Sequence, residues 1–373
     1  MQIISIEPTP SPNVMKINVD EALPLGVSQN FTKEKRENAP EIIDRLLNLE
    51  GVVGVFQVND FIALERHPKA DWKQILADVG KLFGHPSFEG LSKPSSSATF
   101  GEVHVFVQMF KGIPMQVKLS ADGGEMRLAL PEQFGNAVMA VQSASQNLIL
   151  ERQWVDQGIR YGTFKEVGEE VVTEVIAAYD GQRLQEIISE AVGQGSAGRP
   201  PVESISPDAL THPEWEKRFA ALERMNPTAE DIPILAKALH DTKMSIRRLA
   251  TVYLGMIGNQ SLPHLFLALK DKSPAVRRTA GDAISDIGDP LAIGPMAERL
   301  QDPNKLVRWR AARFLFEVGD RSAIPALQEA LNDSEFEVSL QAKLALERIE
   351  RGEEASGTVW QQITQMKNIN RPK

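Results

Sequence analysis

Side chains that could do chemistry are few in this sequence, and their spacing matches no catalytic arrangement. The 373-residue chain has no cysteine, which excludes disulfides, thiol nucleophiles, thiolate zinc sites and cysteine-ligated iron–sulfur clusters. Its six histidines form no HExxH motif and no other pair at metal-ligand spacing. No GxSxG or GxxxxGK[ST] motif occurs. We therefore expect no catalytic, metal-binding or cofactor-binding residue, and a protein that is not an enzyme.

One segment, residues 193–198, has the letters of a GxGxxG dinucleotide-binding motif. That motif binds a pyrophosphate only when it joins a strand to a helix, because the loop amides and the helix N-terminus contact the phosphates. Here a predicted helix precedes the segment, and Arg199, Pro200 and Pro201 follow it. We interpret the segment as a flexible linker.

A true repeat fills the last third of the chain. Aspartates recur at spacings of 30, 31 and 31 residues, each with a leucine two residues earlier and an alanine nine residues later. The repeated residues are Asp241, Asp271, Asp302 and Asp333, with Leu239, Leu269, Leu300 and Leu331, and with Ala250, Ala280, Ala311 and Ala342. Gly258, Gly288 and Gly319 stand where helices should end. A period near 30 with two helices predicts an α-solenoid of about four repeats, and it resembles HEAT-like repeats.

An arginine lies six residues after each of the first three aspartates, at Arg247, Arg277 and Arg308, whereas Ser339 breaks the series. Such a ladder of cations could bind an anion along one edge of the solenoid. We favour a structural role, in which each arginine binds turn carbonyls and neighbouring carboxylates along the stack.

A second, less regular set of side chains offers candidates for contact with a protein partner, since Arg and Trp dominate interface hot spots. The alternative for these residues is a solvated face. The candidates are Arg248, Arg278, Trp309, Arg310 and Arg313.

The elements before the repeats alternate between strand and helix patterns. Residues 1–90 predict the order β-β-α-β-β-α, with a hairpin turn at Asn59-Asp60 and Phe61 in the core. Residues 98–193 predict a strand pair at 103–119, a helix from Pro131, a hairpin of residues 148–155 and 159–164, and two closing helices. Ser-, Gly- and Pro-rich joints separate the segments.

The first segment resembles the N-terminal domain of Nfu-type iron–sulfur scaffold proteins. The resemblance rests on residues 7–17, 49–56, 59–62 and 71–72, which occur in order with consistent gaps. In that family a CxxC motif in a separate domain holds the cluster, and this chain has no cysteine. The resemblance therefore implies a protein-contact role and no cluster binding.

The whole chain resembles the conserved virulence factor C family of Gram-positive bacteria. The expected fold is an α+β N-terminal domain (1–90) and an α+β middle domain (98–193), followed by an all-α HEAT-like α-solenoid (207–352) and a C-terminal tail (353–373). The resemblance implies a link to virulence and haemolysin production. The Nfu-like domain implies a link to iron–sulfur maturation.

The predicted function is that of a non-catalytic cytoplasmic adaptor that binds a protein partner on the solenoid surface. The net charge of −9 and the lack of a basic face argue against nucleic acid, and no apolar run is long enough to cross a membrane. Two alternatives stay open: an accessory lyase for a bilin or other tetrapyrrole, and an iron–sulfur assembly factor that uses a partner's cysteines. Neither the partner nor the oligomeric state follows from the sequence.

Overall fold

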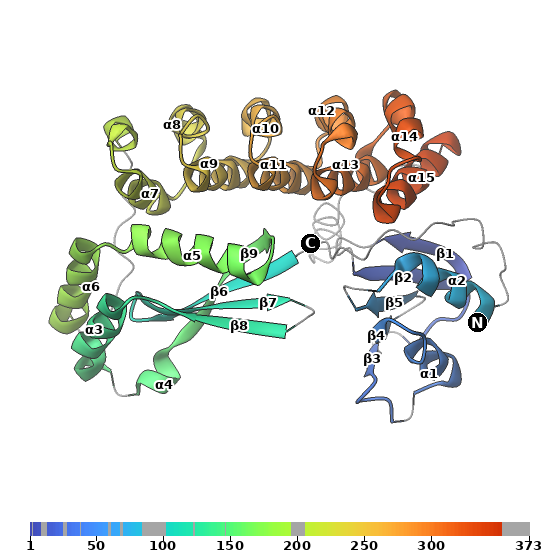
Figure 1. Cartoon of the computed structure of the whole chain (residues 1–373), viewed down its shortest axis with the longest axis horizontal. Helices are drawn as coiled ribbons and strands as arrows, with labels where there is room; N and C mark the ends of the chain where they lie inside the picture. The colour runs from blue at the N-terminus through green and yellow to red at the C-terminus, as the bar shows by residue number, and fades with distance from the viewer. Residues whose placement is uncertain are drawn as a thin grey trace, which may run out of the picture. The chain divides into compact units, whose positions relative to one another are not determined.

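The computed structural model describes residues 1, 3–8, 13–24, 28–37, 39–58, 61–67, 70–83, 102–121, 124–145, 147–194 and 206–352. The chain divides into two compact units, one formed by residues 1–100 with 296–373 and the other by residues 101–295. Their boundary falls inside helix α12 (Ile293–Glu298). Each unit contains an antiparallel sheet and a set of repeat helices, so the fold is α+β followed by a helical solenoid (Figure 1).

The α+β part of the first unit is a five-stranded antiparallel sheet in the order β1-β2-β5-β4-β3, with two helices. Its elements are β1 (Ile3–Pro8), β2 (Val14–Val19), β3 (Ser28–Thr32), α1 (Glu41–Leu47), β4 (Val52–Val58), β5 (Phe61–Arg66) and α2 (Trp72–Leu82). Every second residue of β2 is buried, as expected for a strand with one face in the core. The core joins those residues to Ile43 of α1 and to Trp72 of α2, both at 0 % exposure.

Two details of this domain differ from the expectation. Strand β3, which pairs with β4 at the sheet edge, was not predicted, because its sequence Ser-Gln-Asn-Phe-Thr carries little apolar signal. Phe61 was expected in the core, but it is only half-buried, with the Lys16 ammonium 4.9 Å from its ring centre, and the neighbouring Ile62 is the core residue. The predicted hairpin turn at Asn59-Asp60 lies outside the described residues.

The α+β part of the second unit is a four-stranded antiparallel sheet in the order β8-β7-β6-β9. Its elements are β6 (Glu102–Phe110), β7 (Ile113–Ala121), β8 (Gly124–Ala129), α3 (Glu132–Val141), α4 (Leu148–Glu151), β9 (Gln153–Tyr161), α5 (Phe164–Ala178) and α6 (Gly181–Gln194). Helices α3, α5 and α6 contribute to the same buried core as β6 and β7. Helix α5 lies close to the sheet, since a Cβ atom on Gly168 would come within 2.3 Å of Leu128 Cδ1.

The hairpin predicted for residues 148–164 is wrong. Residues 148–151 form the short helix α4, capped by the Asn147 side chain, and residues 153–161 form one strand that pairs with β6 along its length. Asp156 and Gly158 mimic a turn locally: the Asp156 carboxylate accepts the Gly158 amide at 2.7 Å, and Gly158 has a φ of +79°. The pairing register shifts here, so these residues form a bulge in a strand rather than a chain reversal.

Repeat helices of the second unit run from α7 (Trp215–Glu223) through α8 (Ile232–Ala238), α9 (Met244–Ile257) and α10 (Leu262–Ala268) to α11 (Pro274–Ile287). Short 3-10 turns precede α8 and α10. Ala250 and Ala280 are completely buried, and a Cβ atom on Gly255 would meet the Cβ of Ala283 at 2.7 Å. Small residues therefore let α9 and α11 approach closely.

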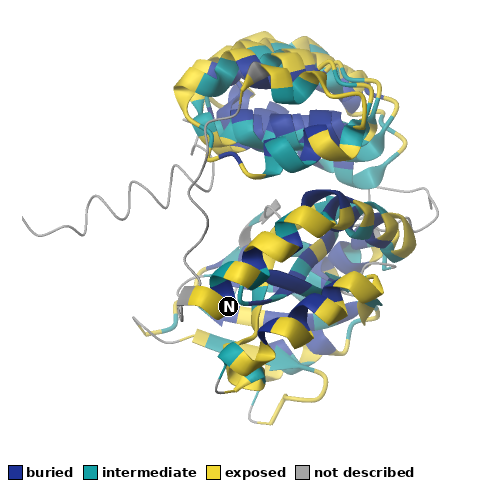
Figure 2. Ribbon diagram, turned by 90° about the vertical axis from the view of Figure 1, so that its left-hand side faces the viewer, coloured by how far each residue is buried: buried dark blue, intermediate teal, exposed yellow. Residues whose placement is uncertain are grey.

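Repeat helices of the first unit are α13 (Lys305–Val318), α14 (Ile324–Ala330) and α15 (Phe336–Glu350). Ala311 and Ala342 are also completely buried. Buried residues, dark blue in Figure 2, lie between the two helices of each repeat, and exposed residues line their outer sides.

Candidate functional site

The repeat aspartates and arginines form hydrogen-bonded links between successive repeats. In the second unit, Arg247 Nη1 donates to the carbonyls of Asp241 (2.9 Å) and Thr242 (3.1 Å) in its own turn. Its Nε and Nη2 donate to the two carboxylate oxygens of Asp271 in the next repeat, at 2.7 and 3.0 Å. Arg308 binds Asp302 O and the Asp333 carboxylate in the same way in the first unit. Arg277 binds the carbonyls of Asp271 and Lys272.

The aspartates are held from both sides. Asp271 also accepts the backbone amide of Ser273 at 2.7 Å. Burial raises the pKa of its carboxyl, but the hydrogen bonds from Arg247 and Ser273 outweigh it, and the pKa lies below the usual 3.8. The Arg247 side chain is 4 % exposed, and its nitrogens already donate to groups within the chain. Arg247 is therefore poorly placed to bind an external anion.

The ladder begins one repeat earlier than the aspartate series. Arg218 on α7 donates to the carbonyls of His212 and Pro213 and to both carboxylate oxygens of Asp241. The missed signal was the spacing of 29 residues between Arg218 and Arg247, which was hidden because His212 replaces the aspartate. Helix α7 is therefore part of the ladder.

Arg248, a candidate partner contact, is instead buried against the middle domain within the second unit. Its Nη2 lies 3.3 Å from Glu174 Oε2 on α5, and its Nε lies 3.5 Å from Glu170 Oε1. Arg160 on β9 donates to the same two carboxylates at 2.6 and 2.7 Å. We call these four residues, Arg160, Glu170, Glu174 and Arg248, the buried charge cluster.

Burial and pairing perturb the ionisation of this cluster in opposite ways. Burial raises the pKa of Glu174, but Arg248 and Arg160 outweigh it and hold the pKa below the usual 4.5. Burial dominates at Glu170, whose pKa is raised, and burial also lowers the pKa of Arg248. Two arginines and two glutamates balance one another, which is the condition under which charges can be buried.

Arg278 is also turned toward the middle domain. Its Nη2 donates to the Tyr161 hydroxyl at the end of β9 at 2.6 Å, and its guanidinium lies 4.2 Å from the centre of that ring. Its Nε donates to Asp282 on the same helix at 3.1 Å. At 2 % exposure, Arg278 has almost no surface for a partner.

The candidates on α13 in the first unit are buried as well, with one exception. Trp309 is 3 % exposed and packs against Val338. Arg313 is 5 % exposed and donates to Glu317 at 2.8 Å, and burial raises the pKa of Glu317. Arg310 is half-buried, with its guanidinium 5.5 Å from the centre of the Trp309 ring. These side chains were chosen as partner-contact candidates by residue type, and the fold buries all of them except Arg310.

A second set of contacts joins the Nfu-like domain to the last repeat helix within the first unit. Arg66 Nη2 lies 3.0 Å from Glu337 on α15, and Arg66 also donates to Ala70 O at 2.8 Å. Its guanidinium lies 5.3 Å from the Trp72 ring centre. Phe336 of α15 packs against the core of the domain. No sequence pattern pointed to Arg66, which is 2 % exposed.

Other candidates for chemistry find no support in the described part of the chain. Among those residues, no group of three or more His, Asp or Glu side chains could hold a metal ion. Gly193 and Gln194 end helix α6, and residues 195–198 of the GxGxxG-like segment lie outside the described residues. Of the helices described, none has both the length and the apolar character needed to span a bilayer.

Family models match three parts of the chain: Scaffold protein Nfu/NifU N terminal over residues 4–87, Virulence factor over residues 108–188, and HEAT repeats over residues 232–303, 262–347 and 293–361. A solved Staphylococcus aureus protein, SAV1430, is 37% identical over 22% of this chain and 99% of its own, with a TM-score of 0.21. The CpcE–CpcF phycocyanin lyase of Nostoc is 18% identical over 39% of this chain and 92% of its own, with a TM-score of 0.28.

Full-length relatives are more closely similar. YpgR of Bacillus subtilis (strain 168) is 52% identical over 98% of both chains. Conserved virulence factor C of Staphylococcus aureus (strain MRSA252) is 41% identical over 98% of this chain and 99% of its own. The protein of that name in Staphylococcus saprophyticus is 39% identical over 97% and 98%. The chain therefore belongs to the conserved virulence factor C family.

Proposed function

We propose that this protein is a non-catalytic adaptor in which the HEAT repeats hold the α+β domains in place for a protein partner. The observation that carries the proposal is the buried charge cluster. Helix α9 of the repeats binds the carboxylates of α5 through Arg248, with Arg278 on α11 binding Tyr161. In this chain, the inner side chains of the repeats are thus engaged in binding another domain.

Because these repeat side chains are buried, we expect a partner to bind elsewhere on the chain. Arg248, Arg278, Trp309 and Arg313 are at most 8 % exposed, so a partner would have to displace contacts within the chain to reach them. Arg310 and the outward sides of the repeats keep accessible surface. The α+β domains, held by the repeats, are then the parts offered to a partner.

The biological setting proposed follows from the relatives. Their name, conserved virulence factor C, supports a role in virulence. Haemolysin production, which the family resemblance implies, is the trait that we propose to measure. The Nfu/NifU N-terminal match supports a partner from the iron–sulfur assembly machinery, contacted by the first domain. Cluster chemistry would then reside on the partner, because this chain has no cysteine.

A co-purification experiment in the native host tests the proposal. The tagged full-length chain is compared with Arg248→Glu, which places a carboxylate among Glu170 and Glu174, and with Lys237→Glu, which makes the same charge change at an exposed site on α8. We expect one protein to co-purify in fixed proportion with the wild type and Lys237→Glu, and less of it with Arg248→Glu.

Haemolytic activity of the cultures is the second measurement. We expect it to fall with Arg248→Glu and with deletion of residues 207–373, and to persist with Lys237→Glu. If no protein co-purifies in proportion and the deletion leaves haemolysis intact, the adaptor proposal fails.

A further inference from the structure

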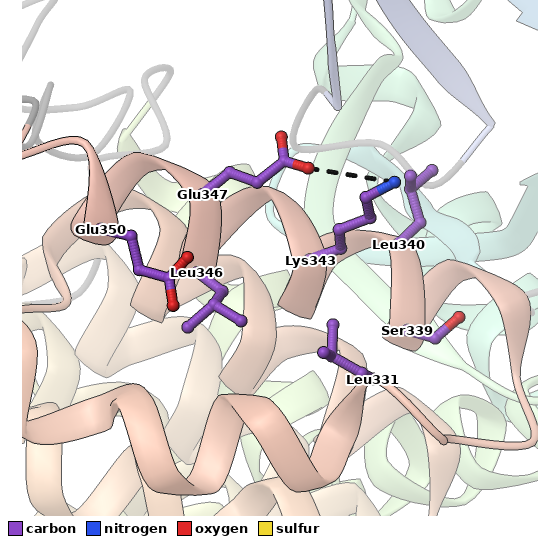
Figure 3. Close-up of a pocket in the computed structure, with 7 residues that line it drawn as sticks. All are labelled: Leu331, Ser339, Leu340, Lys343, Leu346, Glu347 and Glu350. Atoms are coloured by element: carbon purple, nitrogen blue, oxygen red, sulfur yellow. Dashed lines mark ion pairs between the residues drawn. The ribbon is translucent and has the colours of Figure 1, made fainter. Parts of the chain in front are cut away.

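An open groove lies along the last repeat helix, inside the first unit. Figure 3 shows its lining: Leu331 after α14, and a stripe of α15 side chains that ends at Glu350. The groove measures about 390 Å³ and is lined by Leu331, Ser339, Leu340, Lys343, Leu346, Glu347 and Glu350. Its floor is apolar, and Lys343 and Glu347 form an ion pair of 3.9 Å at its rim.

Leu331 in this groove is much more exposed than the leucines at the same position in the earlier repeats. Leu239, Leu269 and Leu300 occupy the position of Leu331 in the earlier repeats and are 7, 2 and 4 % exposed. Leu331 is 38 % exposed. In a solenoid each repeat covers the side of the one before it, and a terminal repeat needs a cap. The described residues provide no such cap for Leu331.

The sequence that follows Gly352 is a candidate for the missing cap. Helix α15 ends at Glu350, and Gly352 has a φ of +68°, the left-handed conformation common for a glycine that follows a helix. Glu350 lines the groove, and 21 further residues, 353–373, follow Gly352 in the sequence. The match to the HEAT repeat family also extends beyond Gly352, to residue 361.

The sequence of that segment complements the groove. Val359, Trp360, Ile363 and Met366 follow the spacing of one face of a helix. Lys367, Arg371 and Lys373 carry charge opposite to Glu347 and Glu350 at the rim. Because the segment is tethered beside the groove, its effective concentration there is about millimolar or higher, which favours it over a free partner.

We propose that the C-terminal segment, residues 353–373, caps the repeat stack by covering this groove, with Ile363 and its apolar neighbours against Leu331 and Leu346. The proposal stands independently of the adaptor function. It assigns the groove to the chain itself rather than to a second copy or another protein.

The absence of cysteine makes a crosslinking test clean. Leu331→Cys is combined with Ile363→Cys in the full-length chain, and the control pair combines Leu331→Cys with Gln361→Cys, which the helical spacing places on the opposite face. Under mild oxidation at low micromolar concentration, we expect an intramolecular disulfide in the first pair at least tenfold faster than in the control. A disulfide-linked dimer from the first pair would assign the groove to a second copy and overturn the proposal.

Hydrogen exchange provides the second measurement, in case the paired cysteines are poorly aligned. A chain that ends at Gly352 should exchange faster than the full-length chain over residues 324–350, by about tenfold, while residues 232–257 of the other unit should not change. Trp360→Ala should reproduce part of this effect, and Gln361→Ala should not. Unchanged exchange over residues 324–350 in the truncated chain, together with no intramolecular disulfide, would overturn the proposal.

Discussion

The two units attach their α+β domain to the repeats with different chemistry. In the second unit the attachment is the buried charge cluster, where two arginines and two glutamates meet at 2.6–3.5 Å. In the first unit the described contacts include the ion pair between Arg66 and Glu337 at 3.0 Å and the apolar contact of Phe336 with the domain core. A domain held by buried charges fails when one charge is removed, whereas apolar contact survives the loss of a single pair.

Hydrogen-bond geometry within the cluster sharpens this contrast. Arg160 binds Glu170 and Glu174 at 2.6 and 2.7 Å within the middle domain, but Arg248 reaches them from the repeats at 3.3 and 3.5 Å. Nε of both arginines has no hydrogen-bond partner among the described residues. The two glutamates therefore make shorter contacts with Arg160 of their own domain than with Arg248 of the repeats.

The largest effect is expected from removing one charge of the cluster. Glu174→Ala leaves Arg160 and Arg248 buried without their shared carboxylate and should lower the free energy of unfolding by about 3–5 kcal/mol. Urea unfolding followed by tryptophan fluorescence measures this loss. Glu169→Ala, at an exposed position five residues earlier on α5, should change the free energy of unfolding by no more than about 0.5 kcal/mol. Equal effects of the two substitutions would contradict the comparison.

Arg247→Lys tests the ladder, which is identical in design in both units. Lysine keeps the charge but cannot donate to two turn carbonyls and to both oxygens of Asp271, so a loss of about 1.5–3 kcal/mol is expected. The control Arg224→Lys, at a side chain 41 % exposed, should be nearly neutral. Anion binding by the ladder would instead appear as a dependence of the wild-type melting temperature on phosphate that Arg247→Lys abolishes.

Glu337→Ala should be milder than the cluster substitution. Arg66 keeps its hydrogen bond to Ala70 O and its place against Trp72, and Phe336 keeps its apolar contact, so we expect a loss of about 1–2 kcal/mol. Hydrogen exchange in α2 and α15 reports on this attachment, with Glu41→Ala at an exposed position on α1 as the control. A loss as large as that of Glu174→Ala would show that the two attachments are energetically alike.

The smallest expected effect is a dependence on pH. The folded pKa of Asp271 lies below 3.8, mainly because hydrogen bonds from Arg247 and the Ser273 amide outweigh burial, so its contribution is present above the unfolded pKa and is lost as pH falls through the folded value. Stability measured from about pH 6 to about pH 3 should therefore fall more steeply for the wild type than for Asp271→Asn. Parallel pH profiles would show that Asp271 has no lowered pKa.

Local patterns in the sequence predicted much of the fold and little of the contact surface. The spacing of Asp241, Asp271, Asp302 and Asp333 indicated the solenoid because each repeat folds against neighbours of the same sequence pattern. The hairpin predicted at Asp156-Gly158 was wrong because the same residues fit a bulge when a strand such as β6 is available for pairing. Propensity alone cannot distinguish these outcomes.

The contacts of the partner-contact candidates could not be predicted from the local sequence. Arg247 and Arg248 are adjacent, but only the position of Arg247 keeps an arginine in the next two repeats, so Arg248 was taken as a candidate for partner contact. Its partner, Glu174, is 74 residues away in a different domain. Nothing in the local sequence of α9 encodes that contact.

By itself, the sequence determined the absence of thiol chemistry, the repeat period and the arginine–aspartate ladder, because each depends on residue type or on short, regular spacing. Only the tertiary structure decided that Arg248 and Arg278 face the chain's own middle domain and that the Leu331 side chain is exposed. The physical reason is that burial of a side chain depends on which distant surface packs against it, and long-range packing leaves no periodic trace in the sequence.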